Sequence, residues 1–237
     1  MNLIFEFISK HEVSAYESYI SGKQINFISY FALFLKNLIN LIEFIFRYIP
    51  GGIGIILRRF LYKILCKKIG KGVIIDIGVY FSHPWHISID DFTWVDAYVH
   101  ITSPYSHVKI GKRVHIGPYS TLGGRGSIDI EDFVGISSHV SIFTGSASPV
   151  RGKRMSGPMV PLKDQAYYNA PVKLEKDAVV GTKSVILPGV TMRKGSVLGA
   201  LTSIDRNTIE YGIYKGSPAI LKNRRRAKIN ESLQTFN

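Results

Sequence analysis

Apolar side chains recur at every sixth position over most of the chain from about residue 69 onward. Eighteen such anchor positions occur, namely Ile69, Ile75, Phe81, Ile89, Val95, Ile101, Ile110, Ile116, Leu122, Ile130, Ile136, Ile142, Leu174, Val180, Ile186, Met192, Leu198 and Ile204. The positions two residues earlier are mostly small or β-branched, among them Val73, Val79, Thr93, Val99, Val108, Val114, Ser120, Val134, Val140, Val172, Ala178, Ser184 and Val190. Three such hexads to a triangular turn predict a mainly β protein, a parallel β-helix of about six coils with a narrow interior.

Two other folds fit this pattern less well. An α-helix requires a period of 3.6 residues, and a β-sandwich with alternating strands would not keep a period of six through residues 174–209.

The register is lost between Ala147 and Leu174, so residues 148–173 must leave the repeat and return to it. Long excursions from a rigid scaffold usually carry function, although a solvated loop is the alternative.

Residues 25–67 differ in kind from the repeat. They form two apolar helical segments separated by Pro50, Gly51 and Gly52, which predicts an N-terminal helical hairpin. The first segment is long enough to span a bilayer, but polar residues interrupt it, at Lys36, Asn37, Asn40, Glu43 and Arg47. A charge at the centre of a spanning helix costs about 2.5–3.5 kcal/mol, which disfavours a span.

The hairpin is therefore expected to touch the membrane peripherally through residues 25–67. In this interpretation it lies in the plane of the membrane and presents basic residues to anionic lipid heads, namely Arg58, Arg59, Lys63, Lys67 and Lys68. Packing of the helices across the top of an oligomer and a true transmembrane span remain open as alternatives.

Charge and cysteine content indicate which partners and which cellular compartment to expect. The chain has 237 residues and a formal net charge of +13, which favours phosphorylated cofactors, anionic lipids or nucleic acid as partners. The single cysteine, Cys66, excludes an internal disulfide, and the N-terminus lacks the pattern of a secretory signal. We expect a cytoplasmic protein at the inner face of the cell membrane.

Three stretches of the repeat carry a family resemblance. They are IGKRVHIGPYSTLGG, IEDFVGISSHVSIF and VVGTKSVILPGVTMRKGSVLGALTSI. The chain resembles the hexapeptide-repeat acyltransferases, particularly the maltose, galactoside and nodulation acetyltransferases and the O-acetyltransferases of polysaccharide gene clusters. The closing segment YGIYKGSPAILKNRRR is similar to the terminal G-x-P-A motif of that family and its basic helix.

The resemblance covers residues 69–226 and implies a division of the chain. Together with the apolar pattern before residue 69, it divides the chain into a helical segment over 1–68, a left-handed β-helix over 69–209, and a C-terminal segment with a short helix over 210–237. It also implies a homotrimer with active sites between subunits, and acetyl-CoA bound as cosubstrate along the C-terminal coils. Neither a metal nor a nucleic-acid partner is expected.

Direct acyl transfer requires a base, and imidazole is suited to that role at neutral pH. Relatives usually carry a histidine just before the excursion, where this chain has Ser146, Ala147 and Ser148. His115 is the first candidate because it precedes an anchor and should therefore point outward, and the family pattern places it on the wall of the acceptor cleft. His139, at a turn one strand before the excursion, is the second candidate, and another histidine remains possible.

The resemblance also implies two sets of binding residues. Small and basic residues would bind the cofactor, namely Gly181, Thr182, Lys183, Gly199, Ala200, Lys215, Lys222, Arg224 and Arg225. Residues in and beside the excursion would bind the acceptor sugar, namely Ser146, Ser148, Arg151, Arg154, Met159, Tyr167 and Tyr168. For the basic residues near the C-terminus, a solvated tail is an equally good interpretation.

The sequence thus predicts an acetyl-CoA-dependent O-acetyltransferase. The acceptor would be a sugar of a surface polysaccharide or of its lipid-linked precursor. The alternative is N-acetylation of a nucleotide-linked amino sugar. A third possibility is a metal-binding β-helix like the γ-type carbonic anhydrases, which use a closely spaced pair of histidines. The spacing of His107, His115 and His139, which are far apart in the sequence, disfavours it. A non-enzymatic scaffold would not bind CoA at all.

Overall fold

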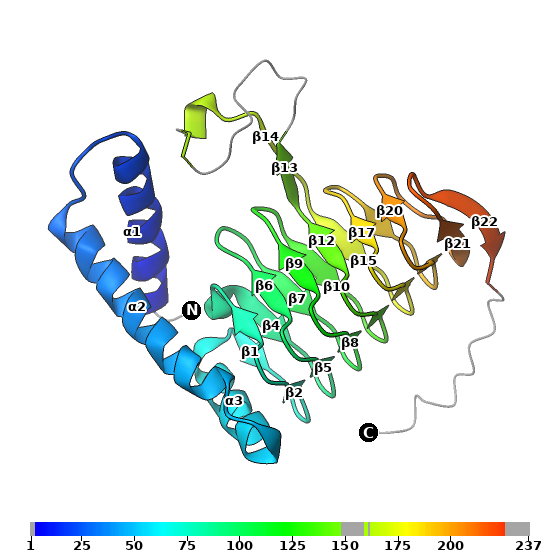
Figure 1. The fold of residues 1–237 in the computed structure, drawn as a ribbon, viewed down its shortest axis with the longest axis horizontal. Coiled ribbons are helices and arrows are strands. Elements are labelled where there is room, and N and C mark those ends of the chain that lie inside the picture. Colours follow the sequence, from blue (N-terminus) through cyan, green and yellow to red (C-terminus); the bar gives the residue numbers. More distant parts are fainter. Residues whose placement is uncertain (1–2, 148–158, 161, 226–237) are drawn as a thin grey trace.

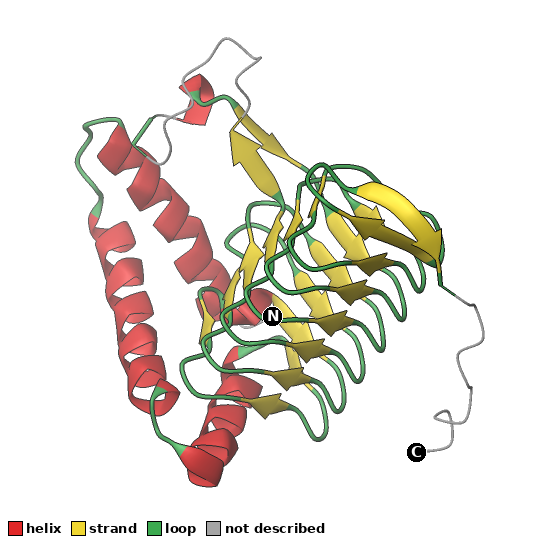
Figure 2. Cartoon of the chain, turned by 45° about the vertical axis from the view of Figure 1, so that its right-hand side comes forward, coloured by secondary structure: helices red, strands yellow, loops and turns green. Residues whose placement is uncertain are grey.

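In the computed structural model, three helices precede a parallel β-helix (Figures 1 and 2). The structure describes residues 3–147, 159–160 and 162–225. The helices are α1 (Leu3–Ile20), α2 (Phe27–Arg47) and α3 (Gly51–Leu65). Short 3-10 helices follow at η1 (Pro84–His86) and η3 (Leu162–Asp164).

The strands of the β-helix stack into three parallel sheets. Sheet A contains β1 (Lys68–Ile69), β4 (Ile87–Ile89), β7 (Val108–Ile110), β10 (Ile128–Ile130), β15 (Val172–Leu174) and β18 (Thr191–Met192). Sheet B contains β2 (Ile74–Ile75), β5 (Trp94–Val95), β8 (His115–Ile116), β11 (Gly135–Ile136), β16 (Val179–Val180), β19 (Val197–Leu198), β21 (Gly212–Lys215) and the antiparallel β22 (Ile220–Arg224). Sheet C contains β3 (Tyr80–Phe81), β6 (His100–Thr102), β9 (Thr121–Gly123), β12 (Ser141–Phe143), β17 (Val185–Ile186) and β20 (Ser203–Ile204).

The hexad register predicted from the sequence is confirmed by the strand pairing. Anchors of the same column are direct partners in neighbouring strands, as Ile89 is with Ile110 and Ile130 is with Leu174. All anchors except the partly buried Ile69 are buried, and so are the slim residues two places before them. The described residues form six full coils, and β21 begins a seventh by placing Tyr214 beside Leu198.

Each coil turns its corners between sheets A and B and between sheets B and C through a left-handed residue three places before an anchor. Tyr98, Tyr119 and His139 occupy this position in successive coils, with φ of 59°, 60° and 58°. Such a conformation is uncommon for residues other than glycine. Here the aromatic rings stack on one another from coil to coil, which offsets part of that cost.

The predicted N-terminal hairpin is present as α2 and α3, but α1 was not predicted. Its sequence mixes apolar and charged residues, so the repeat analysis did not recognise it as a helix. Helix α1 packs against α2 and docks on η1, where the Phe5 and Trp85 rings stack at 4.9 Å. The Trp85 Nε1–H also donates a hydrogen bond to Ser9 Oγ at 2.9 Å.

The C-terminal segment differs from the expectation of a short helix, which was wrong over the described residues up to 225. This segment forms the antiparallel pair β21–β22, which extends sheet B. The physical reason is that β21 continues the repeat: Tyr214 takes an anchor position and is 6% exposed. Residues 226–237 lie outside the described part of the chain.

Arg58 joins the helices to the first coil. Its side chain is 1% exposed; Nε donates to the carbonyl of Ile75 at 3.0 Å, and Nη1 donates to that of Ile49 at 2.6 Å. The same Nη1 lies 3.3 Å from the carbonyls of Phe46 and Arg47, at the C-terminal end of α2. A cation at this end of a helix satisfies free carbonyls and interacts favourably with the helix dipole.

We therefore predict that Arg58→Met destabilises the protein by about 3 kcal/mol, because several buried carbonyls lose their donor. Urea unfolding followed by circular dichroism at fixed protein concentration measures this loss. Lys63→Met on the exposed side of the same helix serves as the control and should leave stability nearly unchanged. Equal stability of the two variants would contradict the role given to Arg58.

Candidate functional site

The turns between sheets B and C stack along one edge of the β-helix, here called the BC edge. Main-chain hydrogen bonds link successive turns: the N–H of His139 donates to Pro118 at 2.9 Å, and that of Lys183 donates to Ser138 at 3.1 Å. The N–H of Leu201 continues the series by donating to Thr182 at 2.9 Å. Side chains on this edge are thus held at fixed positions from coil to coil.

His115 lies on the outer face of sheet B, two residues after the corner residue Arg113 and four before the BC-edge residue Tyr119. Its side chain is 54% exposed, and its Nε2 lies 2.8 Å from Asp96 Oδ2 in the preceding coil. The ring also lies 5.8 Å from that of Trp94. Because the carboxylate orients the imidazole through Nε2, the other nitrogen, Nδ1, is the one that is able to exchange a proton with a bound molecule.

Asp96 was not among the candidates from the sequence. It follows the anchor Val95 directly, whereas His115 precedes the anchor Ile116, so the two residues are 19 apart in the chain. The hexad register does contain the signal, because Val95 and Ile116 are partners across adjacent coils. Aligning the coils by their anchors would have placed the two side chains next to each other.

His139 lies on the BC edge in the coil after that of His115 and is held differently. Its ring stacks on Tyr119 at 5.1 Å with an interplanar angle of 9°, and Tyr119 stacks in turn on Tyr98 at 5.2 Å. Among the described residues no carboxylate pairs with it. His139 thus ends an exposed aromatic ladder and lacks the orienting partner that His115 has.

The residues predicted for the cofactor continue along the BC edge. Gly181, Thr182 and Lys183 form the turn of the coil after His139, and Gly199 and Ala200 form the turn after that. Lys215 lies beside them, because a Cβ on Gly199 would approach its Cγ at 3.0 Å. The structure therefore places His139 and most of the predicted cofactor residues on the BC edge, and His115 on the adjoining outer face of sheet B.

Gly181 has a structural reason for lacking a side chain. A Cβ at this position would lie 2.5 Å from the main-chain nitrogen of Ala200 in the next coil. Gly117, which follows an anchor in the same way, shows the same crowding, at 2.7 Å from a main-chain atom of Ser137. Stacking of the coils thus accounts for these glycines, whether or not a cofactor approaches them.

The basic residues near the C-terminus are spread over β22. The strand runs from the BC edge, where Ile220 pairs with Lys215, toward the opposite edge, where Arg224 pairs with Gly212. Arg225 reaches that opposite edge, since its Nη1 donates to the carbonyl of Asp177 at 3.3 Å. Of the predicted set, Lys222 lies within β22, and Arg224 and Arg225 lie away from the BC edge.

The predicted acceptor residues lie on a different edge, where sheet C passes to sheet A, here called the CA edge. An antiparallel hairpin of β13 (Gly145–Ala147) and β14 (Tyr167–Asn169) rises from it (Figure 1). Ser146 pairs with Tyr168 in this hairpin. Met159 is exposed, and Ser148, Arg151 and Arg154 lie outside the described residues.

Aromatic and basic side chains meet at the base of this hairpin. The Arg125 guanidinium lies 4.5 Å from the Tyr167 ring and 5.7 Å from the Tyr105 ring, and it donates to Gln165 Oε1 at 3.3 Å. Neither Arg125 nor Tyr105 was singled out from the sequence. Both lie in turns that the hexad pattern skips, where the coils carry extra residues.

A second imidazole–carboxylate pair lies near the CA edge. His107 Nε2 is 3.2 Å and 3.3 Å from the two carboxylate oxygens of Asp129. Both side chains of this pair are partly exposed. One chain thus presents His115 with Asp96 by the BC edge, and His107 with Asp129 by the predicted acceptor residues.

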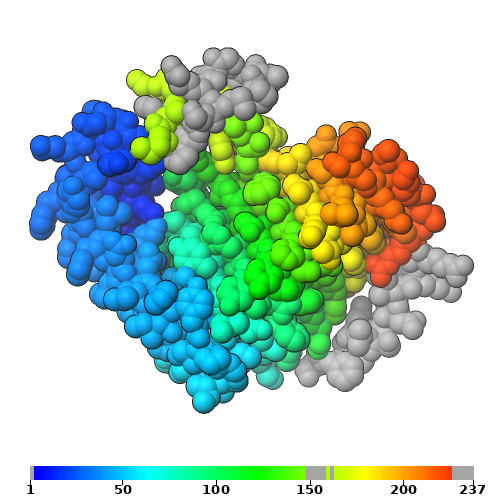
Figure 3. Space-filling model, viewed as in Figure 1, coloured from blue at the N-terminus to red at the C-terminus, as the bar shows by residue number. Residues whose placement is uncertain are grey.

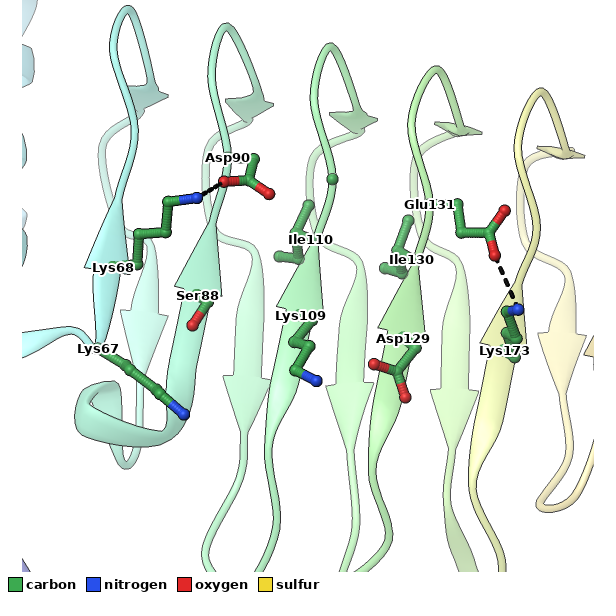
Figure 4. Close-up of a pocket in the computed structure, with 11 residues that line it drawn as sticks. Lys67, Lys68, Ser88, Asp90, Lys109, Ile110, Asp129, Ile130, Glu131 and Lys173 are labelled. Carbon is green, nitrogen blue, oxygen red and sulfur yellow. Dashed lines mark hydrogen bonds and ion pairs between the residues drawn. The ribbon is translucent and has the colours of Figure 1, made fainter. Parts of the chain in front are cut away.

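Asp129 also lines a groove of about 610 Å³ on the outer face of sheet A (Figure 4). Charges of both signs alternate along it, and several are paired, as Lys173 is with Glu131 at 2.7 Å and Lys68 is with Asp90.

Within the described part of the chain, no group of three His, Cys, Asp or Glu residues is placed to hold a metal ion.

No protein-family model matches the chain, but several known proteins are similar to it. A dTDP-4-amino-4,6-dideoxy-D-glucose acyltransferase of Escherichia coli is 29% identical over 170 residues, which are 72% of this chain and 88% of that protein. The crystal structure of AntD, an N-acyltransferase from Bacillus cereus, in complex with dTDP and 3-hydroxybutyryl-CoA, superposes with a TM-score of 0.66 at 28% identity, covering 71% of this chain and 88% of that one.

A more distant structure shares the fold. A hexapeptide-repeat-containing acetyltransferase from Vibrio cholerae O1 biovar eltor, complexed with acetyl-CoA, gives a TM-score of 0.57 at 18% identity, covering 88% of this chain and 96% of that one. A variant of the Bacillus cereus enzyme holds dTDP-4-amino-4,6-dideoxyglucose and coenzyme A, at a TM-score of 0.66 and 27% identity over 71% of this chain and 89% of that one.

The crowding at Gly181 generates a prediction that does not depend on any ligand. Gly181→Ala should destabilise the protein by roughly 1–3 kcal/mol, because its Cβ would displace the main chain of the next coil. Thermal and urea unfolding measure the change. Gly135→Ala is the matched control, since a Cβ there meets nothing within 4 Å. Normal stability of Gly181→Ala with weakened CoA binding would instead assign this glycine to the cofactor.

Proposed function

We propose that the acceptor of this protein, a hexapeptide-repeat β-helix acyltransferase that uses an acyl-CoA donor, is the amino group of a nucleotide-linked sugar. Two similar proteins support this proposal. One carries a dTDP-linked 4-amino sugar in its name, and the other binds such a sugar together with coenzyme A.

The sequence favoured O-acetylation of a polysaccharide sugar, with N-acetylation as the alternative. The comparisons support the alternative better, because the Escherichia coli relative is named as an acyltransferase of a dTDP-linked amino sugar and AntD is an N-acyltransferase. We also propose that the transferred group is acetyl. The structure of the Bacillus cereus enzyme contains 3-hydroxybutyryl-CoA instead.

In the proposed reaction, the neutral amine of the sugar attacks the thioester carbonyl carbon of acyl-CoA. The new C–N bond forms as the C–S bond breaks, and CoA leaves as a thiolate. His115 accepts the proton that the nitrogen loses and returns it to the sulfur, giving an amide and CoA–SH. Asp96 holds the imidazole in place during this transfer through the 2.8 Å contact.

The arrangement of the BC edge supports this assignment. From the coil of His115 to that of Gly199 is three coils, about 14 Å at the usual strand spacing. An extended pantetheine arm would cover such a distance, with its thioester at His115. Its phosphates would then lie near Lys183 and Lys215, where their negative charge is favoured.

We further propose a homotrimer in which the BC edge of one subunit faces the CA edge of the next. Within one chain, His115 and the hairpin tyrosines Tyr167 and Tyr168 lie on different edges. A symmetric trimer would bring the two edges together, so that the hairpin of one copy closes over the histidine of its neighbour. This arrangement also follows from the family resemblance in the sequence.

His115→Ala should lower kcat about a hundredfold or more and leave the affinity for acetyl-CoA unchanged, because only the proton transfer is lost. Asp96→Asn should lower kcat by about tenfold with little change in KM, since it loosens the imidazole and leaves it present. Steady-state kinetics and calorimetric titration with CoA give these values. His139→Ala and His107→Ala are the matched comparisons.

Near-normal turnover of His115→Ala would refute its role as the base. A large loss in His107→Ala alone would move the reaction to the CA edge and to Asp129. Loss of CoA affinity in His115→Ala would make this residue part of the donor site instead.

The acceptor is tested by supplying acetyl-CoA with a dTDP-linked 4-amino-4,6-dideoxy sugar or with its 4-hydroxy counterpart. Release of the CoA thiol and the mass of the product are then followed. We expect an amide from the amino sugar and at least about a hundredfold slower turnover with the hydroxy sugar, which is the weaker nucleophile. The buried Cys66 thiol, whose pKa is raised by burial, should contribute little background to a thiol reagent. Faster ester formation would restore the O-acetyltransferase interpretation.

A further inference from the structure

Helix α2 turns its charged side chains toward the protein. Lys36 Nζ contacts the carboxylate of Glu12 and lies 3.4 Å from His83 Nε2. The Arg47 guanidinium lies 4.3 Å from the centre of the Tyr80 ring. Glu43 is 1% exposed, and burial raises its pKa to about 7. The usual amphipathic arrangement of a surface helix is therefore inverted.

The contacts of Lys36 are strong enough to hold α2 in this orientation. Burial alone would raise the pKa of Glu12, but the hydrogen bonds from His83 and Lys36 outweigh it and lower that pKa to about 2. The Glu12 carboxylate is therefore charged at neutral pH and pairs with the Lys36 ammonium. Rotating α2 to expose its charges to water would break this pair.

The outer face of α2 and α3 is apolar. Six of its large side chains are each more than half exposed, namely Phe34, Leu41 and Ile45 on α2 and Ile53, Ile56 and Phe60 on α3. Together they define what we call the α2–α3 apolar face. The two helices follow one another along the outside of the molecule, at the end of the β-helix opposite β21 and β22 (Figures 1 and 3). An exposed apolar surface of this extent marks an interaction site.

The charge around this face is positive. Residues 21–68 contain eight basic residues, of which Lys36, Arg47 and Arg58 are turned toward the protein, and a single acidic one, Glu43, which is buried. Lys23, Lys63 and Lys67 are exposed. A second copy of the same surface would meet it with charge of the same sign, which is unfavourable at an interface. Anionic lipid headgroups would be attracted instead.

We propose that the α2–α3 apolar face docks on an anionic phospholipid bilayer, with α2 lying in the plane of the membrane. Its apolar side chains would enter the boundary between headgroups and acyl chains, and the exposed lysines would contact the phosphates. The proposal goes beyond the proposed function, because a nucleotide-linked sugar is water-soluble and its acylation does not need a membrane.

Helix α2 does meet the length and composition required of a membrane span. Crossing the bilayer would nonetheless separate Lys36 from Glu12 and carry Lys36 and Glu43 into hydrocarbon, which is costly. In-plane docking keeps every one of these contacts. It also leaves the BC edge and the hairpin on the CA edge free to bind their ligands.

The test is cosedimentation of the full-length protein with vesicles of 70% phosphatidylcholine and 30% phosphatidylglycerol, or of phosphatidylcholine alone. We expect binding to the anionic vesicles that falls with added salt and is about tenfold weaker on the neutral ones. The triple variant Phe34→Ser, Leu41→Ser, Ile45→Ser should weaken vesicle binding by at least about tenfold without changing acyl transfer to a soluble acceptor. Lys63→Glu with Lys67→Glu should weaken binding to anionic vesicles selectively.

The matched control replaces two exposed apolar residues at the other end of the β-helix, Ile220→Ser with Leu221→Ser, and should bind vesicles as the unaltered protein does. Absence of vesicle binding by the unaltered protein would overturn the proposal. So would equal binding by the triple serine variant. If that variant changes the sedimentation velocity of the oligomer, and the unaltered protein ignores vesicles, the face is a contact between copies of the chain.

Discussion

The narrow triangular interior of the β-helix is the constraint on which the rest of the structure depends. Each hexad can place only one large apolar side chain and one slim side chain inside, and the remaining side chains must point outward. Because strands of successive coils pair in parallel, each outward side chain lies directly above one from the coil before. Functional groups far apart in the sequence are therefore brought together by the register alone.

This register explains how much could be predicted from the sequence. The anchors are apolar at a constant spacing, so the coils and their order could be assigned, and the outward direction of His115 followed. Contacts between coils are harder, because the coils differ in length: Ile110 follows Ile89 by 21 residues, whereas Met192 follows Leu174 by 18. The additional residues gather at the CA edge, where the pattern gives no register. Hence the positions of His107 and Arg125 could not be predicted, while His139 and the turn of Gly181 were placed on the correct edge.

The helices show a different limit of prediction. The polar residues Lys36, Glu43 and Arg47 lie on one side of α2, and the usual pattern of a surface helix would turn that side to solvent, the opposite of what the structure shows. The orientation is decided by Glu12 and His83, which lie in other elements and pair with Lys36. The end of the chain shows the same dependence on tertiary context, because β21 is a strand where another coil is available to pair with.

A structure with acyl-CoA bound tests the account most directly, because the account assigns the donor to a single edge of the β-helix. We predict that the cosubstrate lies along the BC edge over the turns of Lys183 and Gly199, with its sulfur beside the imidazole of His115. Binding in the groove of sheet A, or along the edge of Asp177 and Arg225, would contradict it. In that case the reaction would have to be assigned to other residues.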